Sequence, residues 1–265
     1  MLEIDDFFVA GDINQIDLKK SIEKYRYFND AGIPKKDLIE NFSALSRNYN
    51  AKMMFKKNSN ISDNHLQEFW VLRFLEIAEN NNCIFTKKHS SLSKDELKEI
   101  ADISLKDERI KLVQKFLMEK GIALYFIASL PETKIDGAVF LTNNGTIAVG
   151  LTKYKRLDYL WFTLLHELSH TILHSKLLEA GIISIEDSSE EIEVQANKMA
   201  IDAILCYKEY SKMINQKMNS SDIIKYAQDN NIHPALLAGI IRRGKKDHTL
   251  YEDIIDTYKI MENDL

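Results

Sequence analysis

Residues 159–170 read YLWFTLLHELSH, and this stretch decides the expected fold. Its last five residues form an H-E-x-x-H pattern, His166 to His170, inside a segment (157–174) that we expect to be helical. Four residues advance a helix by about 6 Å and one turn, so both imidazoles can reach one zinc ion. Glu167 lies beside them, where it can polarise a water molecule on the metal. Taken alone, the pattern also fits a helix with two surface histidines.

The residues around this pattern are nearly all apolar, which indicates a helix that is buried on almost every side. Two histidines and a glutamate on such a helix need partners, because burying an unpaired polar group is costly. A metal ion would supply that partner. The apolar neighbours are Tyr159, Leu160, Trp161, Phe162, Leu164, Leu165, Leu168, Ile172 and Leu173.

A catalytic zinc ion takes a third protein ligand and keeps its fourth position for water. His174 lies eight residues after His166, about 12 Å along the helix, which is too far to share one ion. The metzincin pattern is also absent, because its glycine turn is missing and position 176 is Lys176. We therefore interpret His174 as a packing or surface histidine.

The next expected helix, 189–209, contains a better third ligand. At 100° per residue, Glu193 falls within the apolar arc of this helix, whereas Glu191 lies on the polar side and Glu190 is borderline. A carboxylate in a buried stripe is explained by a metal ion; the alternative is a solvated glutamate near the helix N-terminus. Asn197, one turn later, could hydrogen-bond a ligand. The apolar arc comprises Ile192, Ala196, Met199, Ala200, Ala203 and Ile204.

Composition places the chain among ordinary globular proteins. It has 265 residues, of which 45% are hydrophobic and 28% charged, with only three prolines and nine glycines, so helix should predominate. The net charge of −5 argues against nucleic acid as the main partner. Two cysteines far apart, no signal peptide and no apolar run near 20 residues predict a cytoplasmic protein without disulfides or a membrane span.

The expected fold class is α+β, with a small, mostly antiparallel three-stranded sheet packed on the H-E-x-x-H helix. The strands are 122–128, 137–142 and 146–151, and Asn143-Asn144-Gly145 predicts a hairpin between the last two. Ser93 and Glu96 form a capping box that begins a helix, which has a possible break near 104–107 and stops at Gly121. Further helices are expected at 221–230 and 234–243.

Several of these segments resemble the ImmA/IrrE family of zinc-dependent metallo-endopeptidases. The similar segments are HELSH at 166–170, EVQANKMA at 193–200 and the approach to the motif at 156–163; IHPALLAG at 232–239 resembles fusions to helix-turn-helix antitoxins of the HigA type. The resemblance implies that His166, His170 and Glu193 bind Zn²⁺ and that Glu167 is the general base. The chain departs from the family at Ser169, where glycine is common, and at 203–206, where a proline is common; neither change removes a ligand.

The change from helical patterns to short apolar runs divides the chain into a helical N-terminal region, 1–114, and a second unit, 115–265. By resemblance, this second unit is a zincin-like metallopeptidase domain with C-terminal helices. The first region holds amphipathic segments at 35–48 and 64–80 but no compact basic helix that would read DNA. Trp70 and Phe74 must be buried somewhere. We expect them to pack on the peptidase domain; a docking face for a partner is the alternative.

The expected function is that of a zinc endopeptidase. By resemblance, it cleaves one regulatory protein, such as a helix-turn-helix repressor, and contacts neither nucleic acid nor membrane. An extended substrate could add to the sheet edge at 146–151. The alternative is a regulatory, antitoxin-like module that binds a toxin or a repressor without cleaving it. The basic run RRGKK at 242–246 is interpreted as a solvated helix end.

Overall fold

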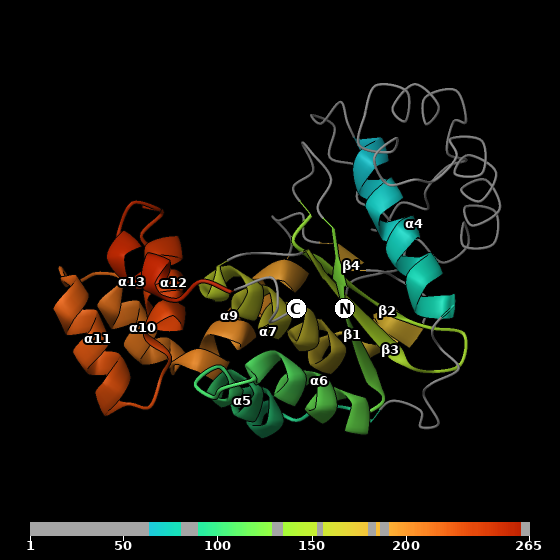
Figure 1. Ribbon diagram of the computed structural model, residues 1–265, viewed down its shortest axis with the longest axis horizontal. Coiled ribbons are helices and arrows are strands. Elements are labelled where there is room, and N and C mark those ends of the chain that lie inside the picture. Colours follow the sequence, from blue (N-terminus) through green and yellow to red (C-terminus); the bar gives the residue numbers. More distant parts are fainter. Residues whose placement is uncertain are drawn as a thin grey trace.

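The computed structural model describes residues 64–80, 90–128, 135–152, 156–179, 184–185 and 191–260. A small sheet and helix α7 lie in the middle, α4 lies at one end, and helices α10 to α13 gather at the other (Figure 1). The helices are α4 (Asn64–Asn80), α5 (Lys94–Ile103), α6 (Arg109–Glu119), α7 (Leu157–Leu173), α8 (Ser175–Glu179), α9 (Glu191–Ile204), α10 (Tyr207–Met213), α11 (Ser220–Asp229), α12 (Pro234–Gly244) and α13 (Glu252–Thr257). Within these ranges, no helix is both long and apolar enough to cross a membrane.

The sheet is mixed, with the strand order β1-β3-β2-β4. Its strands are β1 (Ile122–Ile127), β2 (Gly137–Leu141), β3 (Ile147–Thr152) and β4 (Ser184–Ile185). Strands β2 and β3 form the expected antiparallel hairpin, whose turn includes Gly145 at a φ of 84°. The α+β class is therefore confirmed. Two details differ from the sequence prediction: β1 runs parallel to β3, and a short β4 adds antiparallel to β2.

The position of β3 also corrects one functional expectation. This strand has β1 on one side and β2 on the other, so its backbone hydrogen-bonding groups are already used. A substrate cannot add as a strand at 146–151, because β3 is not an edge.

Helix boundaries follow the local signals in the sequence. Ser93 and Glu96 form both bonds of the capping box that begins α5, and Gly121, at a φ of 72°, follows the end of α6. The single helix expected over 189–209 is wrong, because it divides into α9 and α10. Cys206 leaves helical geometry there, at φ −45° and ψ 126°, and the Asp202 carboxylate accepts a hydrogen bond from the Tyr207 N–H at 2.8 Å.

Helix α4 packs against the sheet. The Trp70 indole N–H donates to the Ala128 carbonyl at 3.1 Å, and the Phe74 ring lies 4.9 Å from that of Phe140. Both side chains are buried. Packing, rather than an exposed docking face, is therefore confirmed for these two residues. The amphipathic segment 35–48 lies outside the described residues.

Candidate metal centre

Helices α7 and α9 bring the candidate ligands together. Nearly every residue of α7 is buried, including His166, Glu167 and His170. Helix α9 packs along α7 and has its alanines Ala196 and Ala200 buried. Glu193, at the start of α9, is only 6% exposed, so the apolar arc that contains it is indeed its buried face.

Three ligand atoms converge between these helices. The Nε2 atoms of His166 and His170 lie 3.1 Å apart. The carboxylate of Glu193 places one oxygen 3.0 Å from the His166 Nε2 and the other 3.4 Å from the His170 Nε2. Donor atoms about 2.0–2.1 Å from a tetrahedral zinc lie about 3.3 Å from one another. The observed spacing therefore fits three corners of a zinc coordination shell, and this donor set is compatible with a metal ion.

The charge of Glu193 suits this role. Burial by itself would raise the pKa of the Glu193 carboxyl, but the adjacent His166 and His170 rings outweigh burial and hold that pKa below its usual range. The Nδ1 atom of His166 is buried and has no hydrogen-bond partner among the residues that the structure describes. The site thus combines an ionised carboxylate with two imidazoles, the donor set that zinc prefers.

Strand β2 approaches α7 closely beside Glu167. A Cβ atom at Gly137 would lie 2.9 Å from the Cγ and the Oε1 of Glu167, and 2.9 Å from the Thr163 methyl carbon. Contacts this short would force the neighbouring atoms to move. Glycine at position 137 therefore leaves the room that the Glu167 side chain occupies. Sequence reasoning missed this residue, although a glycine that opens a predicted strand can signal a close backbone approach.

His174 contacts the site without joining the cluster of three ligands. Its Nδ1 lies 3.0 Å from the Nδ1 of His170, on the opposite side of that ring from the Nε2 that faces Glu193. Burial, and secondarily the His170 ring, lower the pKa of His174. Interpreting His174 as a mere packing residue therefore missed its contact with a candidate ligand. The sequence also suggests that Asn197 could hydrogen-bond a metal ligand. Its Oδ1 has no hydrogen-bond partner in the described part of the chain.

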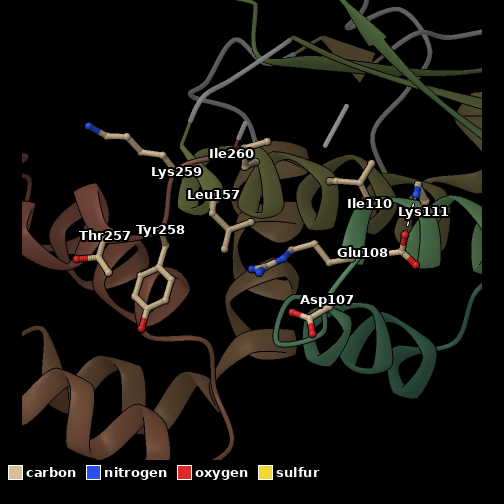
Figure 2. Close-up of a pocket in the computed structure, with 10 residues that line it drawn as sticks. Asp107, Glu108, Ile110, Lys111, Leu157, Thr257, Tyr258, Lys259 and Ile260 are labelled. Carbon is tan, nitrogen blue, oxygen red and sulfur yellow. Dashed lines mark hydrogen bonds and ion pairs between the residues drawn. The ribbon is translucent and has the colours of Figure 1, made fainter. Parts of the chain in front are cut away.

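A cavity of about 370 Å³ lies elsewhere, between the start of α6, the start of α7 and the segment 257–260 (Figure 2). None of the clustered histidines or glutamates lines it. Two of its charged side chains pair with each other: the Lys111 ammonium lies 2.7 Å from the Glu108 carboxylate. The His-His-Glu group has a more specific arrangement of metal-binding atoms than the lining of this cavity has. Cys206 is exposed and forms no disulfide.

Comparison with known proteins agrees with this chemistry. No curated protein is significantly similar to the chain. Residues 119–231 match the model of the Peptidase_M78 family, described as the IrrE N-terminal-like domain. The match spans the sheet, α7 and α9, and so contains all of the candidate ligands. Residues 119–231 are therefore similar to the IrrE N-terminal-like domain, which belongs to a family of metallopeptidase type, as the resemblance in the sequence predicts.

Proposed function

We propose that this protein is a zinc-dependent endopeptidase in which His166, His170 and Glu193 hold the metal. One observation carries the proposal: two imidazole nitrogens and a carboxylate, all buried, lie within 3.0–3.4 Å of one another. Without a metal, this arrangement would bury an ionised group and two rings at a considerable cost. With zinc, the same atoms become ligands.

Glu167 is the proposed general base. Zinc, when bound, would polarise the scissile carbonyl and make a water molecule more acidic. The Glu167 carboxylate follows the first ligand directly on α7, so it can take the proton from the attacking water and pass it to the leaving amine. The absence of a side chain at Gly137 leaves room for the Glu167 carboxylate.

The proposed substrate is one regulatory protein, such as a helix-turn-helix repressor, met in the cytoplasm. The basis is the resemblance of the motif and of segment 232–239 to ImmA/IrrE peptidases and their antitoxin fusions. The alternative is a non-catalytic module that binds a toxin or repressor around a structural metal. It is favoured by one observation: Glu167 has no exposed surface.

Metal content tests the ligand set. Purified protein should contain about one zinc ion per chain, measured by elemental analysis. Glu193→Ala or His170→Ala should remove it, because two protein ligands hold zinc poorly. Glu191→Ala is the matched control, since Glu191 lies two residues away on the same helix but is exposed. Full zinc in Glu193→Ala would show that the third ligand has been misassigned.

Glu167→Gln separates the endopeptidase from the binding module. Glutamine keeps the shape of the side chain but cannot accept the proton, so zinc and fold should persist while hydrolysis falls by about 10²-fold or more. The readout is the set of new protein N-termini in cells that produce the wild-type chain or the variant. Identical N-termini in the two cultures would refute the endopeptidase and leave the binding module.

A further inference from the structure

Strand β2 begins directly beside the proposed general base. A Cβ atom at Gly137 would lie 2.9 Å from the Glu167 Oε1, so the Gly137 backbone borders the candidate metal centre. On the side of β2 away from β3, the described part of the chain adds only the two-residue strand β4 to the sheet. This outer edge of β2 is therefore a place beside the site where another peptide backbone can pair.

The two candidate histidine ligands face this outer edge rather than β3. Seen along α7, at about 100° per residue, His166 and His170 lie about 60–100° to one side of Glu167. Leu164 and Leu168 lie at the same angles on the other side of Glu167, and both are fully buried in the core that includes the apolar side chains of β3. Since Glu167 itself points at β2, the ligands lie on the side of α7 away from β3, where β4 adds to the sheet.

The backbone of β2 presents alternate residues to its two neighbouring strands. The Asp136 carbonyl accepts a hydrogen bond from the Thr152 N–H at 2.9 Å, so the even-numbered residues of β2 bond toward β3. Hydrogen-bonded and non-hydrogen-bonded positions alternate along an antiparallel strand. The outward N–H and C=O groups therefore belong to the odd-numbered residues Gly137, Val139 and Leu141.

Strand β4 already occupies one of these three outward positions. Ser184 lies opposite Val139, and Ile185 lies opposite Ala138, in an antiparallel register. Because Val139 bonds outward, Val139 and Ser184 form the hydrogen-bonded pair, which supplies at most two backbone bonds. A peptide that paired with Gly137 and continued along β2 would meet Ser184 two residues later.

We propose that β4 holds the place of the substrate strand, so that the chain keeps its own peptide-binding edge closed; this inference rests on the proposed endopeptidase function. An extended substrate pairs with β2 in the direction of β4 once β4 has left. It can form hydrogen-bonded pairs at Gly137, Val139 and Leu141, and these pairs supply more backbone bonds than the one pair of β4. The advantage of β4 is that it is tethered beside β2. A long peptide therefore displaces β4, and a very short one does not.

Proline at position 184 tests the contact without any substrate. Ser184→Pro removes the N–H that pairs with Val139, whereas Ser184→Ala keeps it. In the full-length protein, the Val139 amide should exchange with deuterium at least about 10-fold faster in Ser184→Pro than in wild type or Ser184→Ala. The Phe140 amide, which faces β3, should keep its wild-type rate in both variants. An unchanged Val139 rate in Ser184→Pro would show that β4 does not hold this edge, and would overturn the proposal.

Two hydroxamates separate strand pairing from metal binding. Acetohydroxamate reaches the metal alone, while a pentapeptide hydroxamate also needs the outer edge of β2. The pentapeptide compound should bind Ser184→Pro with a dissociation constant at least about 10-fold lower than for wild type, because the open edge no longer has to be freed. Ser184→Ala should match wild type, and acetohydroxamate should bind all three proteins equally. Equal affinities of the pentapeptide compound for the three proteins would overturn the proposal.

A reversible lock tests whether β4 must leave before cleavage. Ala138 and Ile185 form the non-hydrogen-bonded pair, whose short Cα distance suits a disulfide. In a chain without Cys83 and Cys206, oxidised Ala138→Cys/Ile185→Cys should cleave no member of a peptide library, and reduction should restore the cleavage that Ser184→Pro shows. Cleavage by the oxidised form overturns the proposal and leaves the endopeptidase standing. If pentapeptide binding depends on β4 as expected but no form cuts a peptide, the endopeptidase function fails while the closure by β4 stands.

Discussion

His170 presents one ring nitrogen to the candidate metal position and the other to a second histidine. If Nε2 binds a metal, the ring proton must be on Nδ1, because a neutral imidazole carries one proton. The Nδ1 of His174, at 3.0 Å, then accepts that proton in a hydrogen bond. With a metal bound, His174 would thereby fix the tautomer and the orientation of His170, a role that carboxylates and carbonyl groups fill in many zinc sites.

His174→Ala should weaken zinc binding without abolishing it. We expect a loss of affinity of roughly 10–100-fold, measured by competition with a chromophoric chelator. His174→Asn, whose amide oxygen can accept the same proton, should recover most of the loss. The visible spectrum of the Co²⁺-loaded protein should change in His174→Ala, since a freed His170 ring alters the ligand field. Unchanged affinity and spectrum would assign His174 to packing alone.

Single residues were predictable where their placement follows from helical periodicity. The buried position of Glu193 follows from its angle on α9, and the exclusion of His174 as a ligand follows from the rise per residue. The contact between His174 and His170 does not follow, because it depends on the orientation of two rings. The burial of Arg242 likewise depends on how α12 packs against α7, which one helix's sequence does not specify.

At the scale of elements, the approach of β2 to α7 positions Glu167, the proposed general base. Gly137→Ala should push the Glu167 carboxylate from its position, because the new methyl carbon would lie 2.9 Å from two atoms of that side chain. Zinc binding should persist, since neither α9 nor the histidines move, while hydrolysis should fall by about 10²-fold. Elemental analysis and a turnover assay would separate the two effects.

Gly150→Ala is the matched control for Gly137→Ala. Its Cβ would meet the Phe74 ring at 2.7–2.8 Å, on a part of the sheet that α4 covers. This variant should lower the free energy of unfolding by about 1–3 kcal/mol and leave turnover per folded molecule unchanged. Equal loss of turnover in both variants would mean that Gly137 acts through general stability.

Elements were predictable where local chemistry determines them. The capping box at Ser93, the Asn143-Asn144-Gly145 turn and the apolar run of α7 each specify a boundary by themselves. The direction of β1 was not predictable, because parallel and antiparallel pairing bury the same side chains. The break between α9 and α10 also escaped prediction, since residues 205–206 include neither glycine nor proline.

At the scale of the whole molecule, His233 connects the C-terminal helices to α6. Its Nδ1 accepts a hydrogen bond from the Ala235 N–H and so caps α12, and its Nε2 lies 3.2 Å from the Arg109 guanidinium. Burial, and secondarily Arg109, lower the pKa of His233 to about 4. Protonation would add a second positive charge beside Arg109 and remove the acceptor that caps the helix.

Protonation of His233 should therefore lower the free energy of unfolding of the protein in acid. An unfolded histidine titrates near 6.5, so the stabilisation is complete above that pH and is lost as the pH falls from about 6.5 to 4. The full effect is roughly 3 kcal/mol by the shift in pKa. Urea unfolding across this range measures it. His233→Asn, which keeps a capping side chain, should flatten the slope; His248→Asn, at an exposed position, should not.

Removing the N-terminal region should lower the stability of the remaining chain. A chain that begins at residue 90 lacks α4 and leaves Phe140 and the neighbouring sheet face uncovered, so it should be insoluble or unfold at a clearly lower urea concentration. The control is the full chain carrying Glu76→Gln, which retains α4. Native stability of the shortened chain would show that α4 serves recognition instead.

The packing of α4 on strands that follow it much later in the chain also has a consequence during synthesis. Trp70 and Phe74 leave the ribosome about 80 residues before Gly150, against which Phe74 rests. At about 5–20 residues per second, that interval lasts roughly 4–16 s. For those seconds the aromatic face of α4 has no sheet to cover it, and a nascent chain of this kind offers a binding site to ribosome-associated chaperones. The demand for chaperones should thus end when the β2–β3 hairpin has emerged, well before Glu193, the candidate metal ligand on α9, is synthesised.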